Sequence, residues 1–228
     1  MQEFQDRYPR PIATVDAVIL TLSDGRLQVL LHRRPEAPFS GTWGLPGGFI
    51  RQDEDHDTEG AIGRVLREKA GTSGFWVEQL ATFSGPVRDP RGWSISVAYM
   101  ALVPRDRLPV DTDTVRLFDV DALPPLAFDH AAIVAAGLER LRGKGAYSTL
   151  PATLLGEVFT LKDLQNAYEV VLGRTLDTSS FRRRLNEMRL VEEVPGAERR
   201  QTGSGRPSKV FRLARDPHTF DRTLGGAV

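Results

Sequence analysis

The segment that most constrains this 228-residue chain joins a glycine pair, an acidic stretch and a helical pattern. Residues 41–72 read GTWGLPGGFIRQDEDHDTEGAIGRVLREKAGT. Gly47 and Gly48 suit a tight loop in which backbone N–H groups approach a phosphate. The spacing in 57–70 predicts an amphipathic helix, and Gly71 is the residue type expected to end it. An ordinary amphipathic helix would explain that spacing, but not its coincidence with the glycine pair.

This segment resembles a Nudix box, the motif of enzymes that cleave a nucleoside diphosphate linked to another group. Glu54 stands six residues after Gly48, as the motif requires, and Arg64 takes the place of its arginine. Val65 and Lys69 replace two of the three helix glutamates, so Glu68 alone remains on the helix. The loop before Arg64 is also two residues longer than in the motif.

The two replacements change what the helix face offers to a metal ion. Three glutamates at these helical spacings would share one face and hold Mg²⁺, which activates water and neutralises pyrophosphate charge. Here the face offers one carboxylate, one apolar side chain and the cation of Lys69, which can neutralise phosphate but cannot activate water. We therefore expect no metal site, no required cofactor and a nucleotide sensor rather than an enzyme. The alternative is a residual hydrolase that uses Glu54, Glu68 and other acids, such as Asp53 or Asp55, as catalytic residues, and only this alternative needs Mg²⁺.

Composition places the protein among cysteine-free globular proteins. A hydrophobic fraction of 40% is enough for real cores, and no apolar stretch approaches the ~20 residues of a membrane span. The absence of cysteine excludes disulfides and thiolate metal sites. The polar start, MQEFQDRYPRP, does not have the pattern of a signal peptide. These features favour a cytoplasmic location and no membrane partner.

The first part of the chain predicts a mixed α/β fold. Two apolar, β-branched runs flank the turn at 23–25, which is a hairpin signal. Further strands and a second helix follow the helix of the glycine-rich segment, an order that fits the Nudix α/β/α sandwich. The expected strands are 12–22, 27–32, 75–83, 93–103 and 115–120, and the expected helices are 57–70 and 128–142.

The second part predicts a winged helix-turn-helix. Gly143-Lys144-Gly145 is the expected linker, and Thr160 and Gly173 are expected to cap the helix 161–172. Two more helices and a final hairpin complete the pattern. These are the helices 150–155 and 179–190 and the strands 192–200 and 207–213.

Basic residues gather in this second part, although the net charge of the chain is zero. Residues 174–212 hold ten basic and five acidic side chains. Exposed arginine and asparagine on a helix suit base and phosphate contacts in a major groove, and a basic wing tip can follow phosphates. Use of the domain for protein contacts is the alternative. The predicted DNA-binding residues are Arg182, Arg183, Arg184, Asn186, Arg189, Arg199, Arg200, Arg206 and Lys209.

With both parts considered, the chain resembles the NrtR family of Nudix-related transcriptional regulators of NAD metabolism. The resemblance rests on segments in a fixed order, including PFSGTWGLPGGF, VLREKAG, LAFDHAAI, FTLKDLQNAYEVVLG, FRRRL and GRPSKVFR. It implies a nucleotide-sensing Nudix-like domain over 1–145 and a DNA-binding winged helix over 146–228. It also implies a homodimer that represses NAD metabolism genes at palindromic operator DNA until ADP-ribose or a related nucleotide releases it.

Candidate nucleotide contacts come from basic, glycine and aromatic residues of the first part. Arg33, Arg34 and Arg91 are candidates for the diphosphate, and Phe39 or Trp93 for stacking on a base. Asp129 and His130 stand at a predicted helix start, where capping is the expected role. The predicted ligand-binding residues are Arg33, Arg34, Phe39, Gly47, Gly48, Arg64, Glu68, Arg91 and Trp93.

Overall fold

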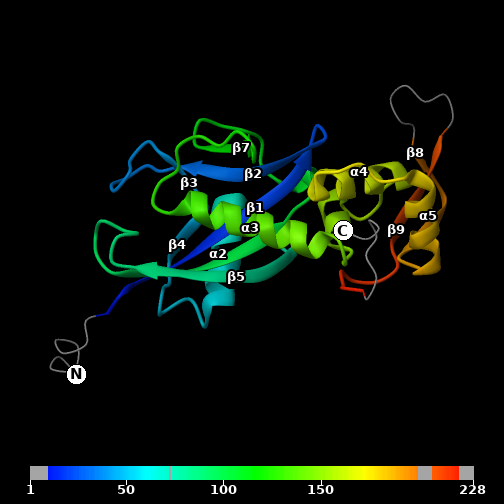
Figure 1. The fold of residues 1–228 in the computed structure, drawn as a ribbon. Helices are drawn as coiled ribbons and strands as arrows, with labels where there is room; N and C mark the ends of the chain where they lie inside the picture. Colours follow the sequence, from blue (N-terminus) through cyan, green and yellow to red (C-terminus); the bar gives the residue numbers. More distant parts are fainter. Residues whose placement is uncertain (1–9, 72, 200–206, 221–228) are drawn as a thin grey trace. The chain divides into compact units, whose positions relative to one another are not determined.

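The computed structural model describes residues 10–71, 73–199 and 207–220 (Figure 1). The chain forms two compact units. The first comprises residues up to 19, 29–101 and 108–137, and the second comprises 20–28, 102–107 and the chain from 138 onward. Within the described ranges, no helix combines the length and apolar character that crossing a membrane requires.

The first unit is built on a sheet whose central strand is β1. The order is β3-β2-β1-β6-β5, while β4 also pairs with β1 and β7 with β2. Val15 and Ala17 to Leu20 are all buried, as expected of a strand that is covered on both faces. The strands are β1 (Ile12–Ser23), β2 (Arg26–Arg33), β3 (Trp43–Gly44), β4 (Gly47–Phe49), β5 (Trp76–Gly85), β6 (Ser94–Leu102) and β7 (Val115–Asp119).

Two helices pack on this sheet. In Figure 1, α3 (His130–Gly145) crosses in front of β1 and α2 (Thr58–Ala70) lies behind the sheet. Gly137 lets α3 approach β1, since a Cβ there would lie 3.0 Å from a methyl carbon of Val18. Asp57 caps α2 by accepting from the Gly60 N–H at 2.7 Å, and Gly71 ends it in the left-handed conformation. The expected α/β sandwich with its hairpin and box helix is confirmed.

The glycine pair forms a strand and not the tight loop that we expected. Gly47 and Gly48 pair with Asp16 and Val15 across the antiparallel β4–β1 ladder, and neither glycine has a positive φ. A Cβ at Gly47 would collide with the Asp16 carboxylate and lie 2.8 Å from the Val15 carbonyl oxygen. The prediction was wrong because glycine serves close approach of two strands here and not freedom of the backbone.

The second unit contains the predicted helices and hairpin. The Thr160 and Asp163 side chains form a capping box at the start of α4 (Leu161–Leu172), and Gly173 ends this helix. Phe159, Tyr168, Phe181 and Leu185 belong to one buried cluster. The other elements are the 3₁₀ helix η2 (Leu150–Leu155), α5 (Thr178–Glu187), β8 (Val191–Arg199) and β9 (Ser208–Leu213).

Two local predictions in this part of the chain were wrong. Gly143-Lys144-Gly145 is the last turn of α3 and not a linker. Gly145 is needed for packing, because a Cβ there would lie 2.8 Å from a methyl carbon of Val171. Arg189 lies beyond the end of α5, with φ of 49°, so it is not a helix residue. The domain ranges 1–145 and 146–228 stay a prediction.

Candidate nucleotide-binding site and DNA-binding surface

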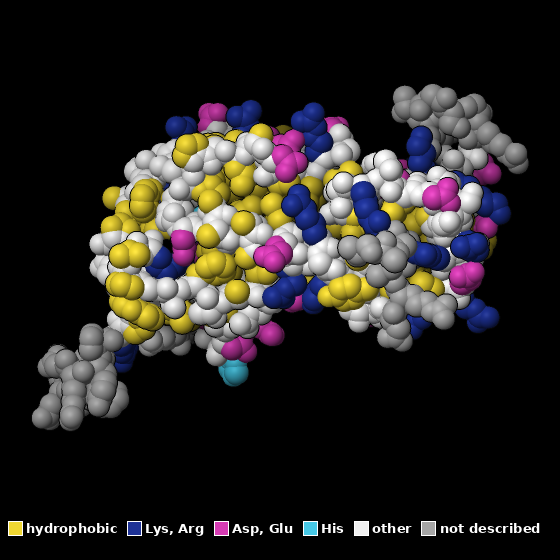
Figure 2. Space-filling view, in the orientation of Figure 1, with side chains coloured by type: hydrophobic (Ala, Val, Ile, Leu, Met, Phe, Trp, Pro, Cys, Tyr) yellow, Lys and Arg dark blue, Asp and Glu magenta, His cyan; other side chains and the backbone are white. Residues whose placement is uncertain are grey.

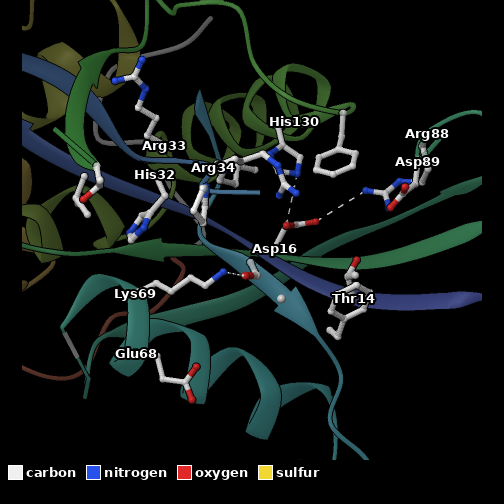
Figure 3. Close-up of a pocket in the computed structure, with 18 of the residues that line it drawn as sticks. Thr14, Asp16, His32, Arg33, Arg34, Glu68, Lys69, Arg88, Asp89 and His130 are labelled. Carbon is white, nitrogen blue, oxygen red and sulfur yellow. Dashed lines mark hydrogen bonds and ion pairs between the residues drawn. The ribbon is translucent and has the colours of Figure 1, made fainter. Parts of the chain in front are cut away.

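A cavity of about 560 Å³ opens in the first unit, within the usual size range of small-ligand pockets. Its walls come from β1, β2, β4, α2 and the segments around Arg88 and Phe128 (Figure 3). Basic side chains outnumber acidic ones in the lining. The basic lining residues are Arg33, Arg34, Lys69, Arg88 and Arg91, the acidic ones are Asp16, Glu68 and Asp89, and two imidazoles and two phenyl rings come from His32, His130, Phe49 and Phe128.

A buried polar network centred on Asp16 forms one wall of the cavity. The Asp16 carboxylate accepts from the Ser96 hydroxyl at 2.5 Å and lies 3.8 Å from the Arg88 guanidinium. Arg88 also makes a bidentate pair with Asp129, at 2.9 and 3.0 Å. Because these charges are paired and hydrogen-bonded, the cavity keeps a polar wall inside an apolar sheet.

His130 positions this wall. Its Nδ1 accepts from the Leu45 N–H at 2.8 Å, so the ring hydrogen of the neutral imidazole is on Nε2, which lies 3.6 Å from Asp16. Burial lowers the pKa of His130, against the attraction of Asp16. The imidazole is therefore neutral near pH 7. We expected Asp129 and His130 to cap the helix, but their side chains have these other partners.

Arg64 joins α2 to the acidic loop 50–57, which precedes this helix. Its guanidinium makes a bidentate pair with Asp55 at 2.7 and 2.8 Å and donates to the Phe49 carbonyl at 3.0 Å. Hydrogen bonding to Asp55 raises the pKa of Arg64, and the same bonds lower the pKa of Asp55 to about 2. Arg64 is buried and is not among the residues that line the cavity.

This ion pair predicts a defined acid sensitivity. Because the pKa of Asp55 is about 2 in the folded chain and 3.8 ordinarily, its stabilising effect is complete above about pH 4. The effect is lost as the pH falls towards 2. We expect Asp55→Asn to melt at a lower temperature than the unsubstituted chain at pH 7, and the difference to shrink between pH 4 and 2. A difference that stays constant in thermal melts across this range would contradict the assignment.

Val65 and Lys69, which replace two glutamates of the motif, lie in different surroundings. Val65 is fully buried, beneath the β4 strand at Gly48. The Lys69 ammonium reaches the cavity and donates to the Gly47 carbonyl (Figure 3). Although the residue as a whole is exposed, desolvation of the amine lowers the pKa of Lys69, and Asp16 opposes this shift. Among the described residues, no group of three or more carboxylate or histidine side chains could hold a metal ion.

Aromatic rings and arginines pack together near the cavity. The Phe128 ring lies 4.9 Å from the Phe39 ring and 4.7 Å from the guanidinium carbon of Arg34. Arg91 lies 5.1 Å from the Phe49 ring, and Asp89 holds it at 2.6 Å. Phe39 and Phe128 have φ of 62° and 54°, which is strained for bulky residues and common at functional sites.

The cavity brings together most of the predicted ligand contacts. Arg64, Phe39 and Trp93 are not among its lining residues, and Trp93 is half exposed immediately before β6. Whether the lining residues bind a nucleotide stays a prediction. The predicted residues that line the cavity are Arg33, Arg34, Gly47, Gly48, Glu68 and Arg91, and sequence reasoning missed Asp16, His32, Phe49, Arg88, Asp89 and Phe128 as lining residues.

In the second unit, α5 separates an apolar and a basic face. Phe181 and Leu185 are buried, while Arg182, Arg183 and Asn186 are exposed. Figure 2 shows Lys and Arg side chains (dark blue) gathered over α5, on the right of the view. This arrangement is the one expected of a helix that contacts DNA.

The wing is the hairpin formed by β8 and β9, and two of its basic side chains form ion pairs with acidic residues. Lys209 pairs with Glu193 at 2.8 Å, and Arg199 lies 3.6 Å from Asp163. Arg200 and Arg206, also predicted to contact DNA, lie outside the described residues. The described wing is therefore a mixture of basic groups and acidic partners.

Both units match known families and structures. Residues 11–137 match the NUDIX domain, and 151–213 match the NrtR DNA-binding winged helix domain. Over 220 residues the chain is 36% identical to the "ADPR responsive transcriptional repressor NtrR" of Acinetobacter baylyi, covering 94% of this chain and 86% of the relative.

Two solved structures extend this similarity. Shewanella oneidensis NrtR complexed with a 27mer DNA superposes with a TM-score of 0.85 at 38% identity, covering 92% of this chain and 98% of that one. The NUDIX domain of the same protein, complexed with ADP ribose, superposes with a TM-score of 0.55 at 38% identity, covering 60% and 92%.

Proposed function

Because the chain belongs to the NrtR family of Nudix-related transcriptional regulators, we propose that it is an ADP-ribose-responsive transcriptional repressor. Its winged helix binds DNA, and its Nudix domain binds ADP-ribose. The finer proposal is that it acts as a homodimer on palindromic operators of NAD metabolism genes, with half-sites about one helical turn apart.

The proposal that the cavity binds a diphosphate rests on three lining cations that have no carboxylate hydrogen-bond partner among the described residues. Arg33, Arg34 and Lys69 donate to main-chain carbonyls, whereas Arg88 and Arg91 are held by carboxylates. The charges of the first three are therefore available to a diphosphate, and charge-assisted hydrogen bonds are the strong ones. Lys69 supplies this charge from the helix position where a metal-dependent enzyme would carry a glutamate.

Release of DNA follows from linkage. ADP-ribose weakens DNA binding only if it binds the DNA-free arrangement better than the DNA-bound one. We infer that the ligand shifts the spacing of two α5 helices in the dimer, because both must reach their half-sites together. A tenfold release requires about 1.4 kcal/mol of differential binding.

A mobility-shift titration tests the proposal. The probe is DNA from the region upstream of the chain's own gene, with ADP-ribose added to the preformed complex. We expect release, and we expect Lys69→Ala to need about tenfold more ADP-ribose, because a charge-assisted contact is lost. Arg67→Ala, which removes an exposed cation from the same helix, is the matched control.

Two outcomes would overturn parts of this proposal. Failure to shift any upstream fragment would reject the repressor function. Rapid formation of AMP and ribose 5-phosphate from ADP-ribose and Mg²⁺, abolished by Glu68→Gln, would establish the hydrolase alternative instead.

A further inference from the structure

We propose that Arg51 and Lys69 are built-in replacements for the divalent cation of the Nudix box, and that Arg51 keeps metal ions off Glu54 and Glu68. The proposal goes beyond the repressor function, because it concerns which cation occupies the box. It would hold even if the chain bound no DNA.

Arg51 bridges the two glutamates that the box retains. One terminal nitrogen of its guanidinium, Nη1, lies 2.8 Å from Glu54 and 3.3 Å from Glu68. Glu54 comes from the loop and Glu68 from α2, so one positive group joins two elements, as a bridging metal ion would. The Glu54 hydrogen bond is the main cause of a raised pKa for Arg51, so this guanidinium stays charged.

The loop is folded so that Arg51 holds this position. The backbone N–H of Arg51 donates to the Asp55 carboxylate at 2.8 Å. The backbone carbonyl of Arg51 accepts from the backbone N–H groups of Glu54 and Asp55 at 3.1 and 2.7 Å. Arg64 holds Asp55 from the other side. The short turn 51–55 is therefore fixed at both ends, which places Glu54 beside Arg51.

Both carboxylate oxygens of Glu68 have a guanidinium partner. Oε1 lies 3.3 Å from Arg51 and Oε2 lies 3.4 Å from Arg64. A magnesium ion binds carboxylate oxygen at about 2.1 Å and needs nearly ideal octahedral geometry. It would have to displace Arg51 and enter a site that already holds two positive charges, so the donor set does not fit the metal.

Lys69 takes the second role of a metal, which is to balance ligand charge. Its ammonium is fixed on the Gly47 carbonyl, at the side of α2 that faces the cavity. A metal-bound water would endanger a bound diphosphate, whereas an ammonium offers charge without a nucleophile. With Arg51 beside Glu54 and Glu68 and Lys69 lining the cavity, the box compensates negative charge without any metal ion.

Manganese binding tests the proposal directly, with Mn²⁺ as a paramagnetic probe for Mg²⁺ sites. Free Mn²⁺ is measured by electron paramagnetic resonance during titration of the full chain. We expect Arg51→Ala and Arg51→Gln to bind Mn²⁺ about three- to tenfold more tightly than the unsubstituted chain, since each removes a competing cation from two exposed carboxylates. Arg67→Ala removes the same charge from the neighbouring helix and should bind like the unsubstituted chain.

A second substitution locates the gained site. Glu68→Gln, added to Arg51→Ala, should abolish the gain. Mn²⁺ binding that is equally tight with and without Arg51, or a gain that survives Glu68→Gln, would overturn the proposal. DNA shift and circular dichroism on the same samples separate this result from the repressor function, because neither depends on a metal ion in the box.

Discussion

Replacing Arg182 and Arg183 together by alanine is expected to weaken DNA binding about 100-fold, because a cationic contact contributes about tenfold. Both side chains are exposed on α5, and the turns that hold them rest on the buried Phe181 and Leu185. Substitution therefore removes contacts without disturbing the core. Each lost phosphate contact should also lower the slope of log affinity against log salt by about 0.9.

The measurement is a salt titration of DNA binding by fluorescence anisotropy. Arg142→Ala with Arg215→Ala is the matched control, because it removes two exposed charges from the same unit outside α5. We expect the control to keep the slope, while the α5 double variant loses nearly 2. Equal slopes in the two variants would contradict the assignment of α5 as the DNA-contacting helix.

The second large effect concerns stability. Phe181→Ala should lower the free energy of unfolding by about 3–5 kcal/mol, the usual cost of removing a buried phenyl ring. Phe181 is 1% exposed and packs edge-on to Tyr168, with ring centroids 5.4 Å apart. Tyr168 is itself fixed by its hydroxyl, which donates to the Ser148 carbonyl at 2.7 Å.

The loss of stability in Phe181→Ala should impair DNA binding more than ADP-ribose binding. Phe181 belongs to the core of the second unit, whereas the cavity residues belong to the first. Denaturant unfolding should show the destabilisation, DNA binding should fail at 37 °C, and calorimetric titration should still detect ADP-ribose binding. Val158→Ala, at a side chain 37% exposed, should change stability by less than about 0.5 kcal/mol. Joint loss of both activities in Phe181→Ala would contradict separate cores.

Local patterns predicted the helices and the hairpin because their causes are local. Thr160 and Gly173 mark the ends of α4 through bonds within a few residues. The burial of β1 follows from its own apolar run. The short strand β4 was missed because its existence depends on pairing with Asp16 and Val15, more than 30 residues earlier.

The cavity wall was the least predictable part, because its contacts join distant residues. The bonds from Ser96 to Asp16 and from Leu45 to His130 span 80 and 85 residues. Arg64 illustrates a second difficulty. Its partner Asp55 lies in the part of the loop whose length departs from the motif, so the motif gave no signal for this ion pair. A polar residue inside an apolar strand, Asp16, was the one available signal.

The acidic partners in the wing change how its contribution to DNA binding should be counted. Lys209 and Arg199 enter a complex already paired, with Glu193 and Asp163. A phosphate that engages either cation replaces the carboxylate partner of that cation. The net gain in electrostatic attraction is therefore smaller than the number of basic residues suggests. The released glutamate or aspartate would then face the DNA and repel it. Pairing therefore weakens the attraction of these two wing cations for any polyanion.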